Sequence, residues 1–134
     1  MSNRISQVTA LTVQIEDRVG ALAEMLDLLR HEGVNMMAFA SQRRRGTALM
    51  MVPSDLEAVR RLAVERGILL SQRQVYMVEG DDGIGVLSDI TQRIADAGVN
   101  IEDVAALSTS QRYAAVFTFA DADMEAVAKA LGLE

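Results

Sequence analysis

Alternating polar and hydrophobic residues, followed by a helical period, mark the first part of the chain. Leu11, Val13 and Ile15 are separated by polar residues, which is the spacing of a half-buried strand. An apolar stripe at helical spacing follows, made of Leu22, Met25, Leu26 and Leu29. Extended patterns return at 34–40 and 47–52, a second helical stripe covers 56–63, and a short strand starts at 68. The pattern therefore predicts the order β-α-β-β-α-β.

The second half of the chain repeats this order. It predicts a strand at 75–78, a helix at 86–97, a hairpin of 99–107 and 113–119, and a last helix after Asp123. We therefore expect an α+β fold of two ferredoxin-like βαββαβ units in tandem, with antiparallel sheets and helices on one face. The domains would be 1–74 and 75–134. The second unit lacks its own last strand, so we expect either a homodimer or the segment Arg4–Val8 to cover the open edge.

Two short motifs recur 65 positions apart and carry the candidate site. Asp17-Arg18-Val19-Gly20-Ala21-Leu22 returns as Asp82-Gly83-Ile84-Gly85-Val86-Leu87, and Gly33-Val34-Asn35 returns as Gly98-Val99-Asn100. Each six-residue turn leads into a helix, whose unpaired first amides favour a carboxylate. An asparagine offers both a donor and an acceptor to a ligand amino group. The same residues also suit a tight turn and a strand-start turn, so both interpretations stay open.

Composition narrows the function classes. The net charge is −6 with five aromatic residues, which is poorly suited to nucleic acid. The absence of cysteine excludes disulfides and thiolate metal sites and fits a reducing cytoplasm. No apolar run is long enough for a membrane span or a signal core. For the basic cluster Arg43-Arg44-Arg45, a solvated turn is favoured over an anion site.

Three other motifs fail as chemical sites. Gly80–Gly85 lacks the spacing and the lysine of a phosphate loop, and its carboxylates would repel phosphate. Asp121–Glu125 lacks the central glycine of a calcium loop. His31 is the only histidine, so no catalytic triad can be assembled. We expect no catalytic residues, no metal and no cofactor.

The element order and the two motifs resemble the ACT domain. Two such units in one short chain resemble the bacterial stand-alone tandem ACT proteins. The resemblance implies an allosteric regulatory protein that is not an enzyme and that binds a free amino acid at Asp17–Leu22 with Asn35, and at Asp82–Leu87 with Asn100. It also implies a ligand-dependent homodimer or partner arrangement. Two alternatives remain: a regulatory subunit that docks on an amino-acid biosynthetic enzyme, and a structural pairing module with degenerate sites.

The chain departs from the family pattern within the turn. Val19 and Ile84 stand where the family has proline, so each turn gains an amide donor. Arg18 in the first copy corresponds to Gly83 in the second. The two sites are therefore not expected to be equivalent, and Arg18 could add a ligand contact in the first copy only.

Overall fold

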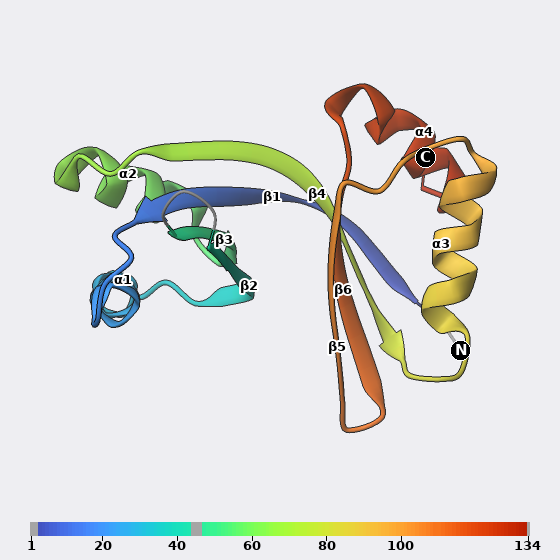
Figure 1. Cartoon of the computed structure of the whole chain (residues 1–134), viewed down its shortest axis with the longest axis horizontal. Coiled ribbons are helices and arrows are strands. Elements are labelled where there is room, and N and C mark those ends of the chain that lie inside the picture. Colours follow the sequence, from blue (N-terminus) through green and yellow to red (C-terminus); the bar gives the residue numbers. More distant parts are fainter. Residues whose placement is uncertain (1–2, 44–46, 134) are drawn as a thin grey trace. The chain divides into compact units, whose positions relative to one another are not determined.

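The computed structural model describes residues 3–43 and 47–133, with the side chains of 38–47 outside the description. The predicted turn at Arg45-Gly46 and most of the Arg43–Arg45 cluster lie outside the described residues. In the first half the elements are β1 (Arg4–Ile15), α1 (Ala21–His31), β2 (Met36–Arg43), β3 (Thr47–Pro53), α2 (Leu56–Arg66) and β4 (Leu70–Asp81). In the second half they are α3 (Val86–Asp96), β5 (Asp103–Thr109), β6 (Arg112–Thr118), the short 3₁₀ turn η1 (Asp121–Asp123) and α4 (Met124–Ala130) (Figure 1).

The chain forms two compact units, and two of its strands contribute to both. One unit is Thr9–Arg73, and the other is Gln74–Glu134 together with the N-terminal residues up to Val8. The strands are hydrogen-bonded in the order β2-β3-β1-β4-β6-β5. Residues 4–8 of β1 thus belong to the second unit, beside β4. This is the missing fourth strand, so the expectation that Arg4–Val8 covers the open edge is confirmed.

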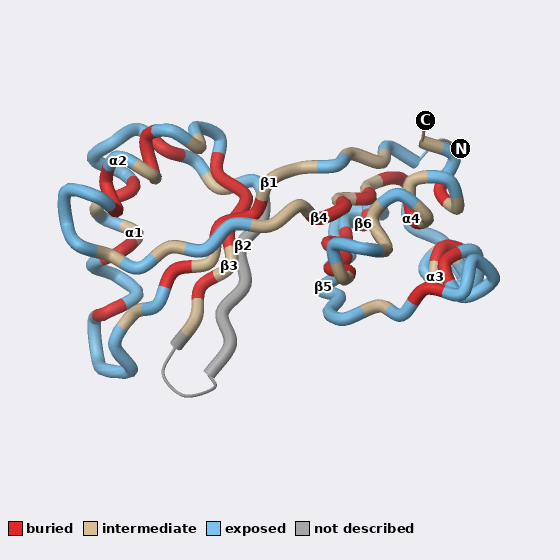
Figure 2. Tube along the Cα trace, turned by 90° about the horizontal axis from the view of Figure 1, so that it is seen from above, coloured by how far each residue is buried: buried red, intermediate tan, exposed pale blue. Residues whose placement is uncertain are grey.

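Each unit has its own hydrophobic core. In the first, β1 pairs with β3 so that Leu11 faces Met51 and Val13 faces Leu49, and all four side chains are buried. Met25 of α1 and Leu62 of α2 pack on this cluster. The second core gathers Tyr76, Ile90, Ile94, Phe117, Phe119 and Val127, with Ile5 of the N-terminal strand packed against it. Figure 1 shows α3 and α4 on one face of β4, β6 and β5, and Figure 2 shows the buried positions along each element.

The predicted fold is confirmed, but the buried side of α1 differs in part from the predicted apolar stripe. Met25 and Leu29 are buried in α1, whereas Leu26 is only half-buried. Leu22 and its counterpart Leu87 are exposed rather than buried. Both leucines stand in the first turn of their helices, where the chain has only just left the strand and the sheet does not yet cover the side chain.

Candidate functional site: two helix-start loops

The two repeated turns form loops of the same backbone shape, which we call the helix-start loops. The first spans residues 16–20 between β1 and α1, and the second spans 82–85 between β4 and α3. Gly20 and Gly85 are the N-cap residues, with φ of 86° and 85°. This left-handed conformation is open to glycine and costly for residues with a Cβ. The sequence repeat is therefore also a repeat of backbone geometry.

Both helices begin without a side-chain cap. In α2, by contrast, the Asp55 carboxylate accepts from the Ala58 N–H at 3.1 Å. Neither α1 nor α3 has such a bond. Among the described residues, the amides of Leu22 and Ala23 in α1, and of Leu87 and Ser88 in α3, have no acceptor. Two adjacent free donors at the positive end of a helix are suited to a carboxylate or another anion.

Each helix-start loop also presents apolar side chains to solvent. Val19 and Ile84, at equivalent positions, are 99% and 109% exposed. Leu22 and Leu87, which also stand at equivalent positions of the repeat, are exposed as well. Large apolar side chains around a few convergent polar groups are typical of small-molecule sites. The open amides and this apolar rim occur together in both copies.

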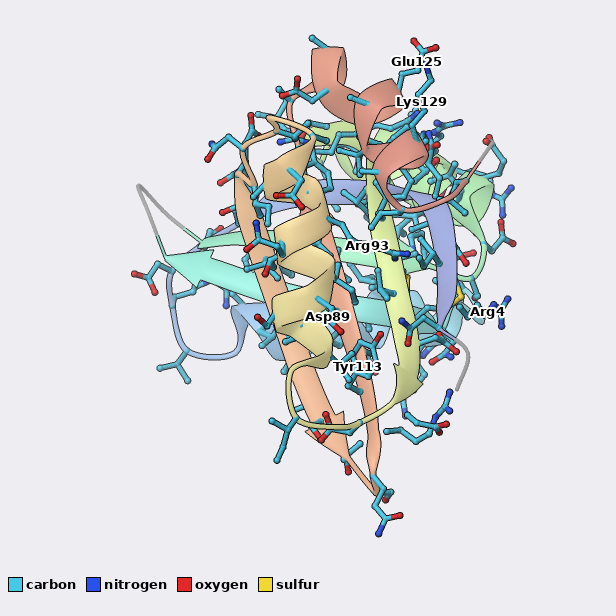
Figure 3. The ribbon with its side chains drawn as sticks, turned by 90° about the vertical axis from the view of Figure 1, so that its right-hand side faces the viewer. Arg4, Asp89, Arg93, Tyr113, Glu125 and Lys129 are labelled. Atoms are coloured by element: carbon cyan, nitrogen blue, oxygen red, sulfur yellow. The ribbon has the colours of Figure 1, made fainter. Side chains whose placement is uncertain are left out.

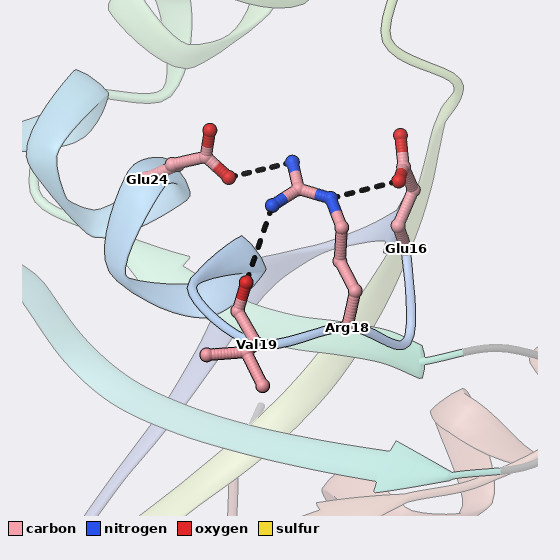
Figure 4. A network of polar contacts seen from close by, with 4 residues as sticks. All are labelled: Glu16, Arg18, Val19 and Glu24. Atoms are coloured by element: carbon pink, nitrogen blue, oxygen red, sulfur yellow. Dashed lines mark hydrogen bonds and ion pairs between the residues drawn. The ribbon is translucent and has the colours of Figure 1, made fainter.

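In the first loop, Arg18 is held by the protein itself. Its Nε donates to Glu16 at 2.8 Å, its Nη2 lies 2.6 Å from a Glu24 carboxylate oxygen, and its Nη1 donates to the Val19 carbonyl (Figure 4). Hydrogen bonding to Glu16, and then to Glu24, raises the pKa of the guanidinium above its usual value. The guanidinium therefore ties the loop to α1, and a ligand would have to compete for it.

In the second loop, the contacts run to the β5–β6 hairpin. The Asp82 N–H donates to the Gln111 carbonyl at 2.8 Å, and the Ser108 hydroxyl donates to the Asp82 carboxylate. Arg112 pairs with Asp81 at 2.9 Å. The hairpin turn itself places Ser110 and Gln111 at positive φ, although such turns prefer asparagine and glycine. The sequence did not predict these contacts between the second loop and the hairpin, because Ser110-Gln111 lacks the asparagine or glycine that usually marks such a turn.

Asn35 directly precedes β2, as expected, whereas Asn100 lies in the connection between α3 and β5, because β5 begins only at Asp103; both asparagines are exposed. The Asn35 N–H donates to Ser54 Oγ at 3.0 Å, and its carbonyl accepts from the Ser54 N–H at 2.7 Å. This backbone bridge gives Asn35 a structural role and leaves its side chain exposed. In the described part of the chain, no hydrogen bond joins Asn100 to the second loop. Their part in ligand binding stays a prediction.

Other candidate groups take simple structural positions. His31 Nδ1 lies 2.8 Å from the Asp27 carbonyl on an exposed helix end. Asp121–Asp123 forms the 3₁₀ turn before α4. In residues 3–43 and 47–133, no group of three or more histidine, aspartate or glutamate side chains is placed to hold a metal ion. None of the helices in these ranges has the length and apolar character that a membrane span needs.

Comparison with family models finds no match, and comparison with curated proteins finds none either. Solved structures of similar fold do exist. BT0572 from Bacteroides thetaiotaomicron superposes with a TM-score of 0.83 at 17% sequence identity. The match covers 97% of this chain and 92% of the BT0572 chain. The ligand-free regulatory subunit of aspartate kinase from Thermus thermophilus gives 0.65 at 20% identity, covering 98% and 96%.

A third similar structure belongs to a larger protein. E. coli aspartokinase III in complex with lysine and aspartate gives a TM-score of 0.57 at 10% identity, covering 98% of this chain and 32% of the enzyme. At these identities the likeness shows the fold. This chain therefore shares the tandem α+β fold of the similar solved structures, two of which are regulatory subunits of aspartate kinase.

Proposed function

We propose that this chain is a regulatory protein that binds a free amino acid at its helix-start loops. The observation that carries the proposal is the pairing, in both copies, of uncapped helix amides with exposed apolar side chains. The likeness to regulatory subunits of aspartate kinase supports a regulatory role. The lysine and aspartate bound by aspartokinase III support an amino acid as the ligand class.

The proposed binding mode assigns the ligand's two charges to different groups. The amides of Leu22 and Ala23, or of Leu87 and Ser88, receive the carboxylate. The ammonium group is held by Asp17 and Asn35, or by Asp82 and Asn100. Each charge-assisted hydrogen bond contributes about 1.5–3 kcal/mol. Because Arg18 is already paired and Asp82 already accepts from Ser108, the two copies would bind with different affinities.

The proposed output is a change of assembly. β5 is the edge strand of the second unit, and it is exposed along its whole length, including Val104 and Leu107. An edge with free backbone groups and apolar side chains is a site for pairing with another chain. We place a second copy there, with the ligand shifting the population of the homodimer. In this proposal the chain is a cytoplasmic, non-catalytic protein with two ACT domains that divide near residue 74, the second being completed by the N-terminal residues up to Val8.

A second candidate is a regulatory subunit that docks on an amino-acid biosynthetic enzyme. It is favoured by the similar structures, two of which are regulatory subunits of aspartate kinase. Stable co-purification with a catalytic subunit would favour this alternative over the homodimer. A structural pairing module with degenerate sites is the third reading, and a panel of amino acids that leaves the melting temperature unchanged would favour it.

The test places a negative charge where the ligand carboxylate would bind. Val19→Asp and Ile84→Asp should each weaken binding at their own loop, because the new carboxylate repels that of the ligand. Val19→Asn and Ile84→Asn are matched uncharged controls, and Val64→Asp adds the same charge at an exposed site on α2. Thermal-shift screening of the twenty amino acids finds the ligand, since a ligand of the folded form raises the melting temperature. Calorimetry then measures each variant.

The asparagines give an independent check. Asn35→Ala and Asn100→Ala should weaken binding without unfolding the free protein, because both side chains are exposed. Equal affinity in the wild type, in the double aspartate variant and in the double alanine variant would contradict the proposed site.

A further inference from the structure

A second hollow lies on the flank of α3, apart from the open amides at the start of that helix. Its volume is about 470 Å³, which is within the range of small-molecule pockets. One wall is formed by α3, which contributes Val86, Asp89, Ile90, Gln92, Arg93 and Asp96, and Asn3 of the N-terminal segment also lines the hollow. All of these residues belong to the second unit.

Two opposite charges face this hollow without partners. Figure 3 shows Asp89 and Arg93 on the side of α3 next to β4. They stand one helical turn apart, where such pairs commonly meet. Both residues are exposed, and neither side chain forms a hydrogen bond or ion pair with any residue that the structure describes. By comparison, Asp27 and Arg30 on α1 are paired at 2.6 Å, as are Glu57 and Arg60 on α2.

A structural role explains only part of this arrangement. Asp89 lies in the first turn of α3, where a negative charge suits the helix dipole. That role does not require Arg93 to stay unpaired beside it. Ile90, which is 1% exposed, forms an apolar floor between the two charges. The hollow therefore combines a cation, an anion and an apolar surface.

The opposite wall is held in place by a buried tyrosine. The Tyr113 hydroxyl donates to Asn3 Oδ1 at 2.9 Å, and Tyr113 itself is 4% exposed. Burial raises the pKa of Tyr113, so its hydroxyl stays protonated and remains the donor at neutral pH. Since Oδ1 of Asn3 accepts this bond, the Asn3 amide group supplies donors rather than acceptors to the cavity.

We propose that this cavity is a second ligand site, for a small zwitterion with a carboxylate and an ammonium group. Arg93 and the Asn3 amide bind the carboxylate, Asp89 binds the ammonium, and Ile90 with Val86 contacts the aliphatic part. Asp96, whose Oδ1 accepts from Gln92 Nε2 at 2.8 Å, adds a further negative charge. The charged lining is therefore net negative and favours a ligand with one more cationic group. The ligand class is therefore a basic amino acid. This site stands independently of the helix-start loops.

The probe is L-lysine. Two ligands serve as comparisons: cadaverine, which lacks the carboxylate, and glycine, which lacks the second cation. Amide chemical shifts of the ¹⁵N-labelled full chain map the binding surface, and calorimetry measures affinity. We expect lysine to shift the amides of 89–96 and to bind more tightly than cadaverine or glycine. Arg93→Gln should lower lysine affinity about tenfold or more and remove the preference over cadaverine. Asp89→Asn should lower it similarly, and Arg93→Lys should restore part of the loss.

The control variants remove one positive and one negative charge from a helix of the other unit. Arg30→Gln and Asp27→Asn on α1 should leave lysine binding unchanged. The proposal is overturned if lysine fails to bind, if its shifts are confined to residues 17–22 and 82–87, or if Arg93→Gln binds lysine like the wild type. Ile84→Asp separates the two sites, because it should abolish binding at the second loop and spare the cavity.

Discussion

At the scale of single residues, Arg18 shows how two copies of one motif come to differ. Its guanidinium joins Glu16 to Glu24 across the first helix-start loop (Figure 4). The equivalent position in the second copy is Gly83, which has no side chain. Asp81, the counterpart of Glu16, pairs instead with Arg112 of the hairpin. The first loop is thus tied to its own helix, and the second is tied to a neighbouring turn.

The two tyrosines should make the second unit sensitive to alkaline pH. Burial raises the pKa of both Tyr76 and Tyr113 above the usual value of about 10. Above that pH the unfolded chain releases phenolic protons that the folded chain retains. The stabilising contribution is therefore complete below about pH 10 and is lost as the pH rises further.

The absorbance of phenolate measures this directly, because the chain has two tyrosines and no tryptophan. Both should titrate at higher pH in the folded protein than in denaturant. Tyr113→Phe should leave one titrating group and reduce the alkaline loss of stability. Identical titration of the folded and unfolded protein would contradict the effect of burial.

At the scale of the elements, the first helix shows why a hydrophobic stripe does not by itself define the buried side. Met25 and its counterpart Ile90 are both buried, whereas Leu26 is half-buried and corresponds to Thr91. Because Met25 and Leu26 are both apolar, the sequence alone does not decide which of the two faces the core, and a small rotation of the helix about its axis would exchange them. Contact with the sheet selects the rotation, and the second copy, which has threonine there, has less ambiguity.

This difference predicts unequal costs for two truncations. Ile90→Ala should lower the free energy of unfolding by about 2–5 kcal/mol, because it leaves a cavity in a closed core. Leu26→Ala should cost clearly less, since part of that side chain is already in solvent. Urea denaturation followed by circular dichroism measures both. A larger loss for Leu26→Ala than for Ile90→Ala would mean that α1 is rotated from the position seen here.

At the scale of the whole molecule, the N-terminal segment completes a unit whose other residues begin at position 74. Ile5 packs on the second core, and Tyr76 O–H lies 3.3 Å from Gln7 Oε1. The strand therefore contributes both apolar contact and a covered edge for β4. Stability of the second unit depends on residues at the opposite end of the sequence.

Ile5→Asp should destabilise the second unit by roughly 1–3 kcal/mol, because it places a charge against an apolar core. Tyrosine fluorescence reports this unit alone, since both tyrosines lie in it. Arg4→Gln, at an exposed neighbouring position, is the control. Hydrogen exchange at residues 74–81 should accelerate in Ile5→Asp. An unchanged exchange rate there would show that the strand is dispensable.

Assembly through β5 gives a further prediction for the whole molecule. Leu107→Lys should weaken the proposed homodimer, because charged side chains on an edge strand oppose pairing. Sedimentation velocity at several concentrations measures the effect, and Val64→Lys on α2 is the matched exposed control. If Leu107→Lys leaves the dimer dissociation constant unchanged, the interface does not involve β5.

The sequence by itself determined the element order, the repeat and the turn before each of the two repeated helices. These depend on local physics: alternation makes strands, helical spacing makes helices, and a turn before a helix needs glycine at Gly20 and Gly85. The repeat places Val19 and Ile84 at equivalent positions, and both are fully exposed. Neighbouring residues in the chain are enough to decide such features.

Only the tertiary structure decided which distant residues meet. The bond between Asp82 and Ser108, the contact of Asn3 with Tyr113 and the hollow beside α3 join segments that no sequence period connects. Helix rotation in α1 was likewise decided by packing against the sheet. Such contacts depend on the register and stacking of whole elements, and a one-residue change of register or rotation would remove them.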